Sequence, residues 1–252
     1  MTLNADDLFM FDTLGYLHLR GALSAAEVSE LLTLVEQTRT VDVRQLNADD
    51  SRLPHQLNRP VSRMIDAEPR FAQLLDHPAV VPALEASLGA DYRHIDNDLY
   101  FTVPGFAGGR WHRGVRAHPT GHVVDGAFIC PMVKVFYCLT DVGPGQGEFT
   151  VLPGSHKSNF DVDQQRLDLP GQHIFDDVRA GDVIIFNEAL IHNGRPNPSD
   201  RLRITLIVNF GRADAGPWPG YEPNPATLAA VSERQRRILT PGAPVWREPV
   251  LA

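Results

Sequence analysis

Two histidines and one arginine of this chain have the residue types and the spacing of a metal site with a bound acid beside it. His112 stands in the stretch Trp-His-Arg-Gly-Val-Arg-Ala-His, and His192 stands in Ile-His-Asn-Gly. Arg203 follows eleven residues after His192. Two neutral imidazoles are ligands that suit Fe(II), and one arginine can bind a cosubstrate carboxylate through two parallel hydrogen bonds. The three residues therefore indicate a non-haem iron centre.

Position 114 lacks the carboxylate that usually completes such a centre. In the common arrangement of two histidines and one carboxylate, an Asp or Glu follows the first histidine by two residues, and other positions on the metal stay open. In this chain that place holds Gly114. His112 and Gly114 lie two apart on a predicted strand, so they point to the same side. The protein then either binds no metal or binds one with a coordination position left vacant.

Composition limits the class of protein. A chain of 252 residues that is 43% hydrophobic and 21% charged is ordinary for a globule with a full core. The net charge of -8 argues against binding of a nucleic-acid polymer. No apolar run reaches the roughly 18 residues that would indicate a membrane span. Only Cys130 and Cys138 occur, and the first residues lack a signal-peptide pattern, so we expect a cytoplasmic protein. The oligomeric state has no signal in the sequence.

Helical patterns come first along the chain, and short strands follow. Ser24 and Glu27 form a capping box before a helix. A second helical segment, 68–88, is divided by Pro78 and Pro82. From residue 92 the pattern changes to short strands between Gly and Pro turns, which is typical of a sandwich or barrel. The predicted strands are 98–103, 111–115, 127–130, 132–140, 148–152, 173–175, 182–186 and 202–210.

These elements predict a mainly β fold with flanking helices in a single domain. The N-terminal helices would occupy residues 1–90, the β core 92–212 and a Pro- and Gly-rich tail 213–252. In the strand before the tail, even positions from 202 to 210 are apolar and odd positions are mostly polar. Because side chains alternate between the two faces of a strand, one face should pack on helices and the other should face a polar cavity that holds Arg203.

The order of the motifs resembles the phytanoyl-CoA dioxygenase family of Fe(II)/2-oxoglutarate enzymes, whose fold is a double-stranded β-helix of the jelly-roll or cupin type. The resemblance covers residues 8–210. Its matching pieces are Gly-Tyr-Leu-His-Leu-Arg-Gly-Ala-Leu-Ser at 15–24, Trp-His at 111–112, Val-Phe-Tyr-Cys-Leu-Thr-Asp-Val at 135–142, Val-Leu-Pro-Gly-Ser-His-Lys at 151–157, Gly-Asp through His192, and Ser-Asp-Arg-Leu-Arg at 199–203.

The resemblance implies a role for each residue that matches a family motif. His112 and His192 would be the iron ligands, and Arg203 would bind the C5 carboxylate of 2-oxoglutarate, with Arg201 as the alternative. Tyr137 stands where the family often places an aromatic side chain against that cosubstrate. The implied cofactors are Fe(II), 2-oxoglutarate and O₂. The turn with His156 is structural in the family, so we do not expect that histidine to be a ligand.

Gly114 departs from the family pattern. His-x-Gly is similar to the iron/2-oxoglutarate halogenases, in which the missing side chain leaves room for chloride beside the iron. A halide would restore the lost negative charge and fill the vacated volume, so chloride would act as both ligand and cosubstrate. This interpretation predicts chlorination of an aliphatic carbon. The alternatives are a hydroxylase or oxidase in which Asp125, Glu148 or water fills the gap, and a non-catalytic binding protein on the same fold.

A run of basic residues lies next to the proposed site. Between Asp98 and Asp125 the chain has no acidic residue. A cationic rim concentrates anionic ligands, and arginine binds phosphate or carboxylate bidentately. We therefore predict a small anionic substrate, such as a nucleotide or a CoA thioester, that is bound by Arg113, Arg116 and His118. The alternative is that these arginines pair with distant acids at the surface. The basic residues of the run are Arg110, His112, Arg113, Arg116, His118 and His122.

Overall fold

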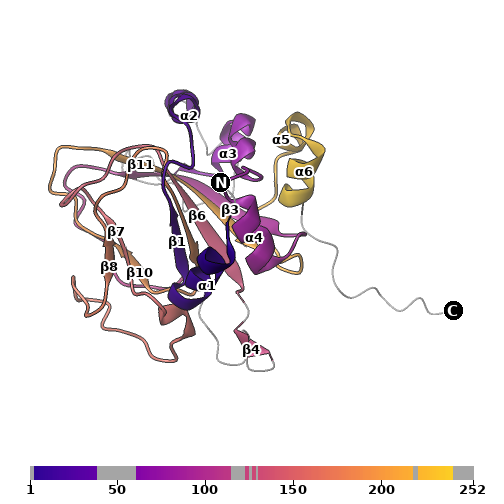
Figure 1. The fold of residues 1–252 in the computed structure, drawn as a ribbon. Helices are drawn as coiled ribbons and strands as arrows, with labels where there is room; N and C mark the ends of the chain where they lie inside the picture. The colour runs from indigo at the N-terminus through magenta and orange to yellow at the C-terminus, as the bar shows by residue number, and fades with distance from the viewer. Residues whose placement is uncertain are drawn as a thin grey trace.

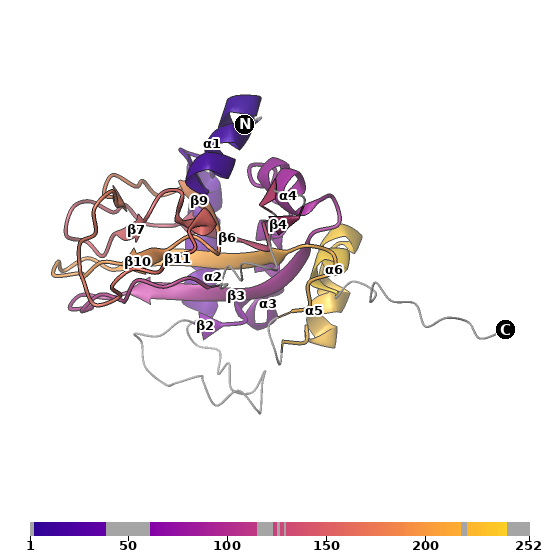
Figure 2. The ribbon, with the colours of Figure 1, turned by 90° about the horizontal axis from the view of Figure 1, so that it is seen from below.

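A six-stranded antiparallel sheet forms the centre of the fold. The computed structural model describes residues 3–38, 61–114, 123–124, 127–128, 130–217 and 221–240. Figure 1 shows the sheet in the middle of the molecule. Its strands, in spatial order, are β1 (Tyr16–Leu19), β9 (Val183–Asn187), β6 (Met132–Cys138), β11 (Arg203–Gly211), β3 (Arg93–Thr102) and β2 (Val61–Ser62). Figure 2 shows that β11 and β3, the two longest strands, run side by side.

A smaller sheet faces one side of the main sheet. It consists of β10 (His192–Gly194), β7 (Phe149–Val151) and β8 (His173–Phe175), with β7 in the middle. A separate two-stranded ladder joins β4 (Val123–Val124) to β5 (Ala127–Phe128). Aromatic rings fill the space between the two larger sheets, where Phe136, Phe149 and Phe186 pack with ring centroids 4.8–5.0 Å apart. This cluster fixes the distance between the two sheets that carry the candidate site.

Helices cover the other side of the main sheet, as Figure 1 shows. The capping box predicted at Ser24 and Glu27 is present, because each residue's backbone N–H donates to the side chain of the other. The predicted segment 68–88 is two pieces, and Pro82 stands in the first turn of the second. None of the described helices is long and apolar enough to cross a membrane. The helices are α1 (Ala5–Leu14), α2 (Ala25–Thr38), α3 (Met64–Ala67), η2 (Pro69–Leu74), α4 (Val81–Leu88), η3 (Ser155–Lys157), α5 (Pro225–Ala230) and α6 (Glu233–Leu239).

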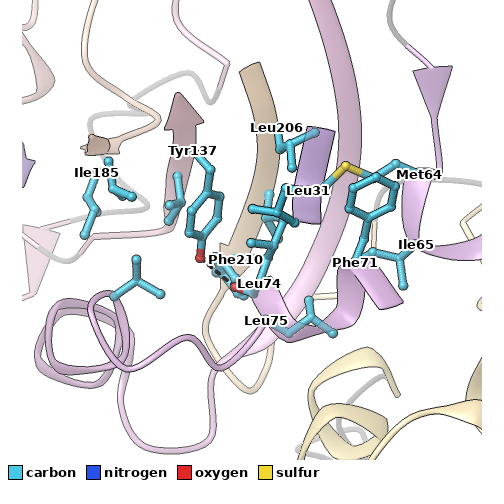
Figure 3. Packing of buried hydrophobic residues seen from close by; sticks show 14 of the residues in the cluster. Leu31, Met64, Ile65, Phe71, Leu74, Leu75, Tyr137, Ile185, Leu206 and Phe210 are labelled. Carbon is cyan, nitrogen blue, oxygen red and sulfur yellow. Dashed lines mark hydrogen bonds between the residues drawn. The ribbon is translucent and has the colours of Figure 1, made fainter. Parts of the chain in front are cut away.

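The alternation predicted for the last strand sorts β11 into two faces. Leu206 and Phe210 belong to the buried cluster shared with the helices, which Figure 3 shows at close range. Ile207 belongs instead to the cluster between the two sheets. Arg203, Thr205 and Ile207 follow one another at every second position of β11, and side chains two residues apart point to the same side. Arg203 and Thr205 therefore also face the smaller sheet. The prediction of one apolar and one polar face is therefore confirmed, and it puts Arg203 on the inner face.

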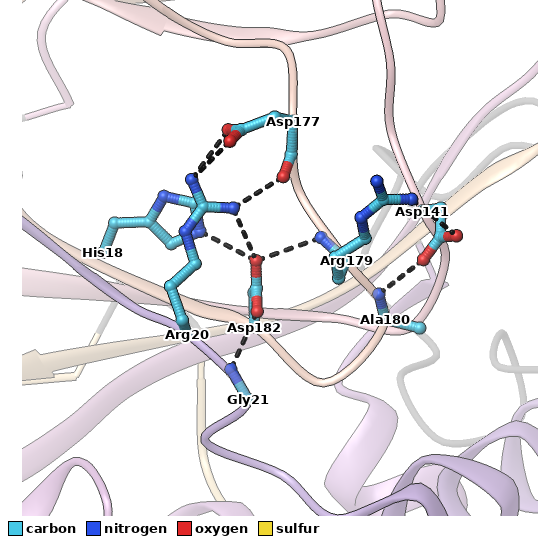
Figure 4. Close-up of polar contacts among 8 residues, drawn as sticks. All are labelled: His18, Arg20, Gly21, Asp141, Asp177, Arg179, Ala180 and Asp182. Atoms are coloured by element: carbon cyan, nitrogen blue, oxygen red, sulfur yellow. Dashed lines mark hydrogen bonds and ion pairs between the residues drawn. The ribbon is translucent and has the colours of Figure 1, made fainter.

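A buried carboxylate fixes the edge of the main sheet where the chain enters it. Asp182 accepts hydrogen bonds from the backbone N–H groups of Gly21 and Arg179, and from the side chains of His18 and Arg20 (Figure 4). Arg20 also pairs with Asp177. These contacts join the end of β1 to the start of β9. They hold in register the strand that leads to the turn before His192.

Candidate metal and cosubstrate site

His112 and His192 lie side by side although they are far apart in the sequence. Each backbone N–H donates to the other residue's carbonyl at 3.0 Å, so His112 forms an isolated antiparallel bridge to β10. The two ring centroids are 4.2 Å apart. His112 is exposed, whereas His192 is only 4% exposed and packs against the rings of Phe149 and Phe186. Solvent therefore reaches the pair at His112, whereas the rings around His192 exclude water.

Both rings are held in the form that a metal ligand needs. Nδ1 of His112 lies 2.8 Å from the carbonyl oxygen of Arg110, and Nδ1 of His192 lies 2.8 Å from that of Leu190. A carbonyl only accepts, so each Nδ1 carries the hydrogen and each Nε2 keeps its lone pair. Burial lowers the pKa of His192 well below its ordinary value, and the neighbouring His112 and Lys134 lower it further. His192 is therefore neutral, as coordination requires.

A carboxylate occupies the space beside Gly114, and it comes from Glu188. A Cβ placed on Gly114 would overlap Oε1, Cδ and Cγ of Glu188. Glu188 lies in the turn between β9 and β10, is 2% exposed, and pairs with Nζ of Lys134 at 2.6 Å. Its Oε2 is buried and has no hydrogen-bond partner among the described atoms. Even so, no three His, Cys, Asp or Glu side chains in the described ranges stand together as a preformed metal site.

The carboxylate beside Gly114 is neither of the two that the sequence suggested as alternatives, Glu148 and Asp125. Glu148 is buried, but its Oε1 accepts the N–H of Gly145 at 2.6 Å, and its charge acts on Arg203. Asp125 lies outside the described residues. Glu188 was missed at the sequence level, although it had a signal. It stands inside the apolar run from Val183 to Ile191, and a lone acid in such a run is seldom buried without a partner.

Arg203 is a buried cation on the inner face, and one hydrogen bond of its guanidinium is seen within the described residues. It is 8% exposed, and its Nη1 donates to the carbonyl of Gly147 at 2.7 Å. Thr205, two residues along the same face, has a buried hydroxyl with no partner among the described atoms. Arg201, the alternative, is exposed. Arg203 and Thr205 together are suited to bind a carboxylate such as the C5 group of 2-oxoglutarate.

Tyr137 does not face the same space as Arg203, which corrects the prediction that it contacts the cosubstrate. Its hydroxyl donates to the carbonyl of Leu74 at 2.6 Å, and its ring is fully buried between the main sheet and the helices (Figure 3). The β6 residues on the inner face are its neighbours Phe136 and Cys138. On the inner face, the aromatic residue of β3 nearest to Arg203 by register is Tyr100, which pairs with Thr205.

Arg113 also has a role other than the one predicted. Its Nη1 donates to the carbonyls of Ser155 and Ala189 at 2.7 and 3.0 Å, and its Nη2 donates to those of Ser158 and Phe160. Its Nε lies 3.3 Å from Asp161. With all three nitrogens engaged, Arg113 ties the loop after β7 to the turn before His192, and it does not form part of a substrate rim. This is a correction, and its reason is the set of backbone acceptors from distant segments.

The remaining predicted residues are placed as follows. Arg116, His118 and His122 lie outside the described ranges. His156 lies beside α1, with its Nε2 3.0 Å from the carbonyl oxygen of Asp12.

Comparison with known proteins agrees with the geometry of this fold. The phytanoyl-CoA dioxygenase family matches residues 11–205. The chain belongs to this family. It is a non-haem Fe(II)/2-oxoglutarate-dependent oxidoreductase, and the mainly β, jelly-roll fold class predicted from the sequence is confirmed.

Three known proteins are similar to this chain, one in sequence and two in fold. An ectoine dioxygenase of Nocardia farcinica is 28% identical over an alignment of 239 residues, and the match covers 82% of this chain and 78% of the relative. HygX of Streptomyces hygroscopicus, solved with nickel and 2-oxoglutarate bound, superposes with a TM-score of 0.69 at 24% identity, over 84% of this chain and 88% of HygX. The carbocyclase SnoK from nogalamycin biosynthesis superposes with a TM-score of 0.66 at 22% identity, over 98% and 94% of the two chains.

Proposed function

We propose that this chain hydroxylates an aliphatic carbon of a small molecule, with iron held by His112 and His192 and 2-oxoglutarate held by Arg203. The observation that carries the proposal is the histidine pair: two adjacent rings whose Nδ1 atoms both donate to backbone carbonyls, which leaves two Nε2 lone pairs for one metal. Retention of the pair together with a buried arginine on the inner face argues against the alternative of a non-catalytic binding protein.

The residues around the proposed metal position have roles that do not depend on the chemistry of the metal itself. Bound Fe(II) with 2-oxoglutarate and O₂ would supply the oxidant that breaks an unactivated C–H bond, with 2-oxoglutarate oxidised to succinate and CO₂. Arg203 and Thr205 would orient the cosubstrate through its carboxylate. Phe149 and Phe186, against His192, keep water from the buried side of the pair and so strengthen electrostatic interactions there.

Chlorination is a second candidate, and Gly114 is the observation that favours it. The absence of a side chain at 114 removes the carboxylate that the family pattern places beside the iron. Chloride as a ligand and cosubstrate would have to occupy space that Glu188 fills, although Lys134 offers a positive charge there if the carboxylate moves. Because a carboxylate already holds this space, we place hydroxylation first.

We propose a small metabolite with a phosphate or carboxylate group, such as a nucleotide or a CoA thioester, as the substrate class. The support is the basic run, of which Arg110 is exposed and Arg116 and His118 lie outside the described residues.

Anaerobic titration with Fe(II) and 2-oxoglutarate tests the proposal. The wild type should develop the weak visible charge-transfer band of a bound iron–2-oxoglutarate chelate, and His112→Ala and His192→Ala should not. Succinate release and product mass, measured with and without chloride, then separate the two reactions. A wild type that binds neither metal nor 2-oxoglutarate would show that the proposed function is wrong, and a chlorinated product would replace hydroxylation with the second candidate.

A further inference from the structure

We propose that Glu188 supplies to the metal the carboxylate that position 114 lacks. This inference rests on the proposed function, because it takes His112 and His192 as the first two ligands. The family pattern places the carboxylate two residues after the first histidine. In this chain it would come from the turn that precedes the second histidine.

The position of Glu188 is the first argument. Three atoms of its side chain occupy the volume into which a side chain at 114 would extend. The backbone fixes this arrangement, because the N–H of Gly114, two residues after His112, donates at 3.0 Å to the carbonyl of Glu188, four residues before His192. Glu188 and Gly114 are therefore neighbours across the same pair of segments that brings the imidazoles together. Any side chain larger than glycine at 114 would displace this carboxylate.

The unpaired oxygen is the second argument. Oε1 of Glu188 pairs with Lys134, while Oε2 is buried and has no partner among the described atoms. A buried carboxylate oxygen without a partner is costly, and a bound cation is one of the few groups that relieves that cost. Glu188 is 2% exposed, so it is not simply solvated. Oε1 is the atom of Glu188 nearest to the side-chain position at 114, so the carboxylate reaches that position while Oε2 keeps its lone pairs for a cation.

Lys134 explains how the carboxylate is kept in place before the metal binds. Its Nζ pairs with Oε1 of Glu188 at 2.6 Å, and the carboxylates of Asp96 and Asp98 also act on its charge. When Glu188 rotates toward the metal, two other carboxylates remain near Lys134. The described residues hold no complete three-ligand cluster, so this rotation is part of the proposal.

Metal affinity, measured without turnover, tests the role of Glu188. Isothermal titration calorimetry and visible absorption with Co(II) should show that Glu188→Gln, which keeps the shape of the side chain, weakens binding by on the order of 10- to 100-fold. Glu148→Gln is the matched control, because Glu148 is also a buried glutamate but lies near Arg203. It should bind Co(II) like the wild type. Equal affinity in Glu188→Gln and the wild type would overturn the inference, as would an equal loss in the control.

Moving the carboxylate back to position 114 gives an independent readout. Gly114→Asp alone should bind Co(II) poorly, because the new side chain overlaps Glu188. Combined with Glu188→Ala, which empties that space, Gly114→Asp should recover affinity lost in Glu188→Ala. A double variant that binds no more tightly than Glu188→Ala counts against the inference.

The two levels of the proposal fail in different ways. If Glu188→Gln binds Co(II) normally while His112→Ala does not, only the inference about Glu188 is wrong. If the wild type does not bind Co(II), or if His112→Ala binds it normally, the proposed function itself is wrong. Lys134→Met separates a metal-binding role of Glu188 from a structural one. Without Lys134, Glu188 should still bind Co(II). The affinity of this variant for Co(II) should equal or exceed that of the wild type. A loss as large as that in Glu188→Gln would show that the ion pair, rather than the free carboxylate, shapes the site.

Discussion

Replacing Arg203 with Ala should remove most of the chain's affinity for 2-oxoglutarate and leave its affinity for metal. Arg203 is 8% exposed, and among the described residues its guanidinium donates to one acceptor, the carbonyl of Gly147. A guanidinium has about five N–H donors, so several remain for a carboxylate. Breaking a buried charge pair costs about 3–5 kcal/mol, and about 1.4 kcal/mol corresponds to a factor of ten. The dissociation constant should therefore rise roughly 100- to 4,000-fold.

Calorimetry of 2-oxoglutarate binding to the Co(II)-loaded protein measures this effect without turnover. Arg201→Ala is the matched control, since Arg201 is an exposed arginine two residues earlier and should bind the cosubstrate like the wild type. Arg203→Lys should fall between the wild type and Arg203→Ala, because lysine keeps the charge but not the planar fork of donors. Unchanged affinity in Arg203→Ala would refute the reasoning. An equal loss in Arg201→Ala would transfer the role to that residue.

Three further predictions concern position 114, the buried Asp182 at the edge of the main sheet, and the basic run between Asp98 and Asp125. Gly114→Asp should end any chlorination, because its side chain overlaps Glu188 and weakens metal binding and because its carboxylate repels halide; chlorinated product from this variant would contradict the expectation. Asp182→Asn should lower the free energy of unfolding by about 1–3 kcal/mol at neutral pH. Although burial opposes ionisation, hydrogen bonds lower the pKa of Asp182 below 3.8, so its contribution is present above pH 3.8 and is lost as pH falls through the folded value. Urea denaturation of both proteins at neutral and acidic pH should show the difference shrinking. Arg116→Ala and His118→Ala should weaken binding of an anionic substrate most at low salt, because exposed charges are screened within about 8–10 Å near physiological ionic strength; an equal loss for a neutral analogue would argue against a charge role.

Structural features that depend on a single segment of the chain could be predicted from local sequence periodicity. The alternation in β11 identified the face that holds Arg203, because the two-residue period of a strand is independent of its partners. The capping box at Ser24 was found for the same reason. His112 and His192 were expected to meet, and their rings lie 4.2 Å apart. Their role as ligands stays a prediction.

Tyr137 and Arg113 show why the rest needed the structure. Which residues of β6 share a face with Arg203 depends on the register between two strands, and a shift of one residue sends every side chain to the opposite face. Tyr137 differs from the inner-face residues by that single position. Arg113 looked free because the sequence around it holds no acid, but its acceptors are backbone carbonyls of residues 155–160 and of Ala189. Backbone acceptors have no sequence signature.

The same limitation applies to the gap at Gly114, and there it changes the chemistry expected. Viewed along one strand, a missing carboxylate suggests a missing ligand and hence room for a halide. Across the bridge, the space is already filled by a carboxylate from the other histidine's segment. Glu188, Asp96, Asp98 and Lys134 together carry a formal charge of -2, opposite in sign to a divalent metal. What a metal needs is negative charge at the right place, and two adjacent segments can each deliver it. A glycine after the first histidine therefore does not by itself predict halogenation: the residues that face it across the bridge must also be small or uncharged, and in this chain the facing residue is a glutamate.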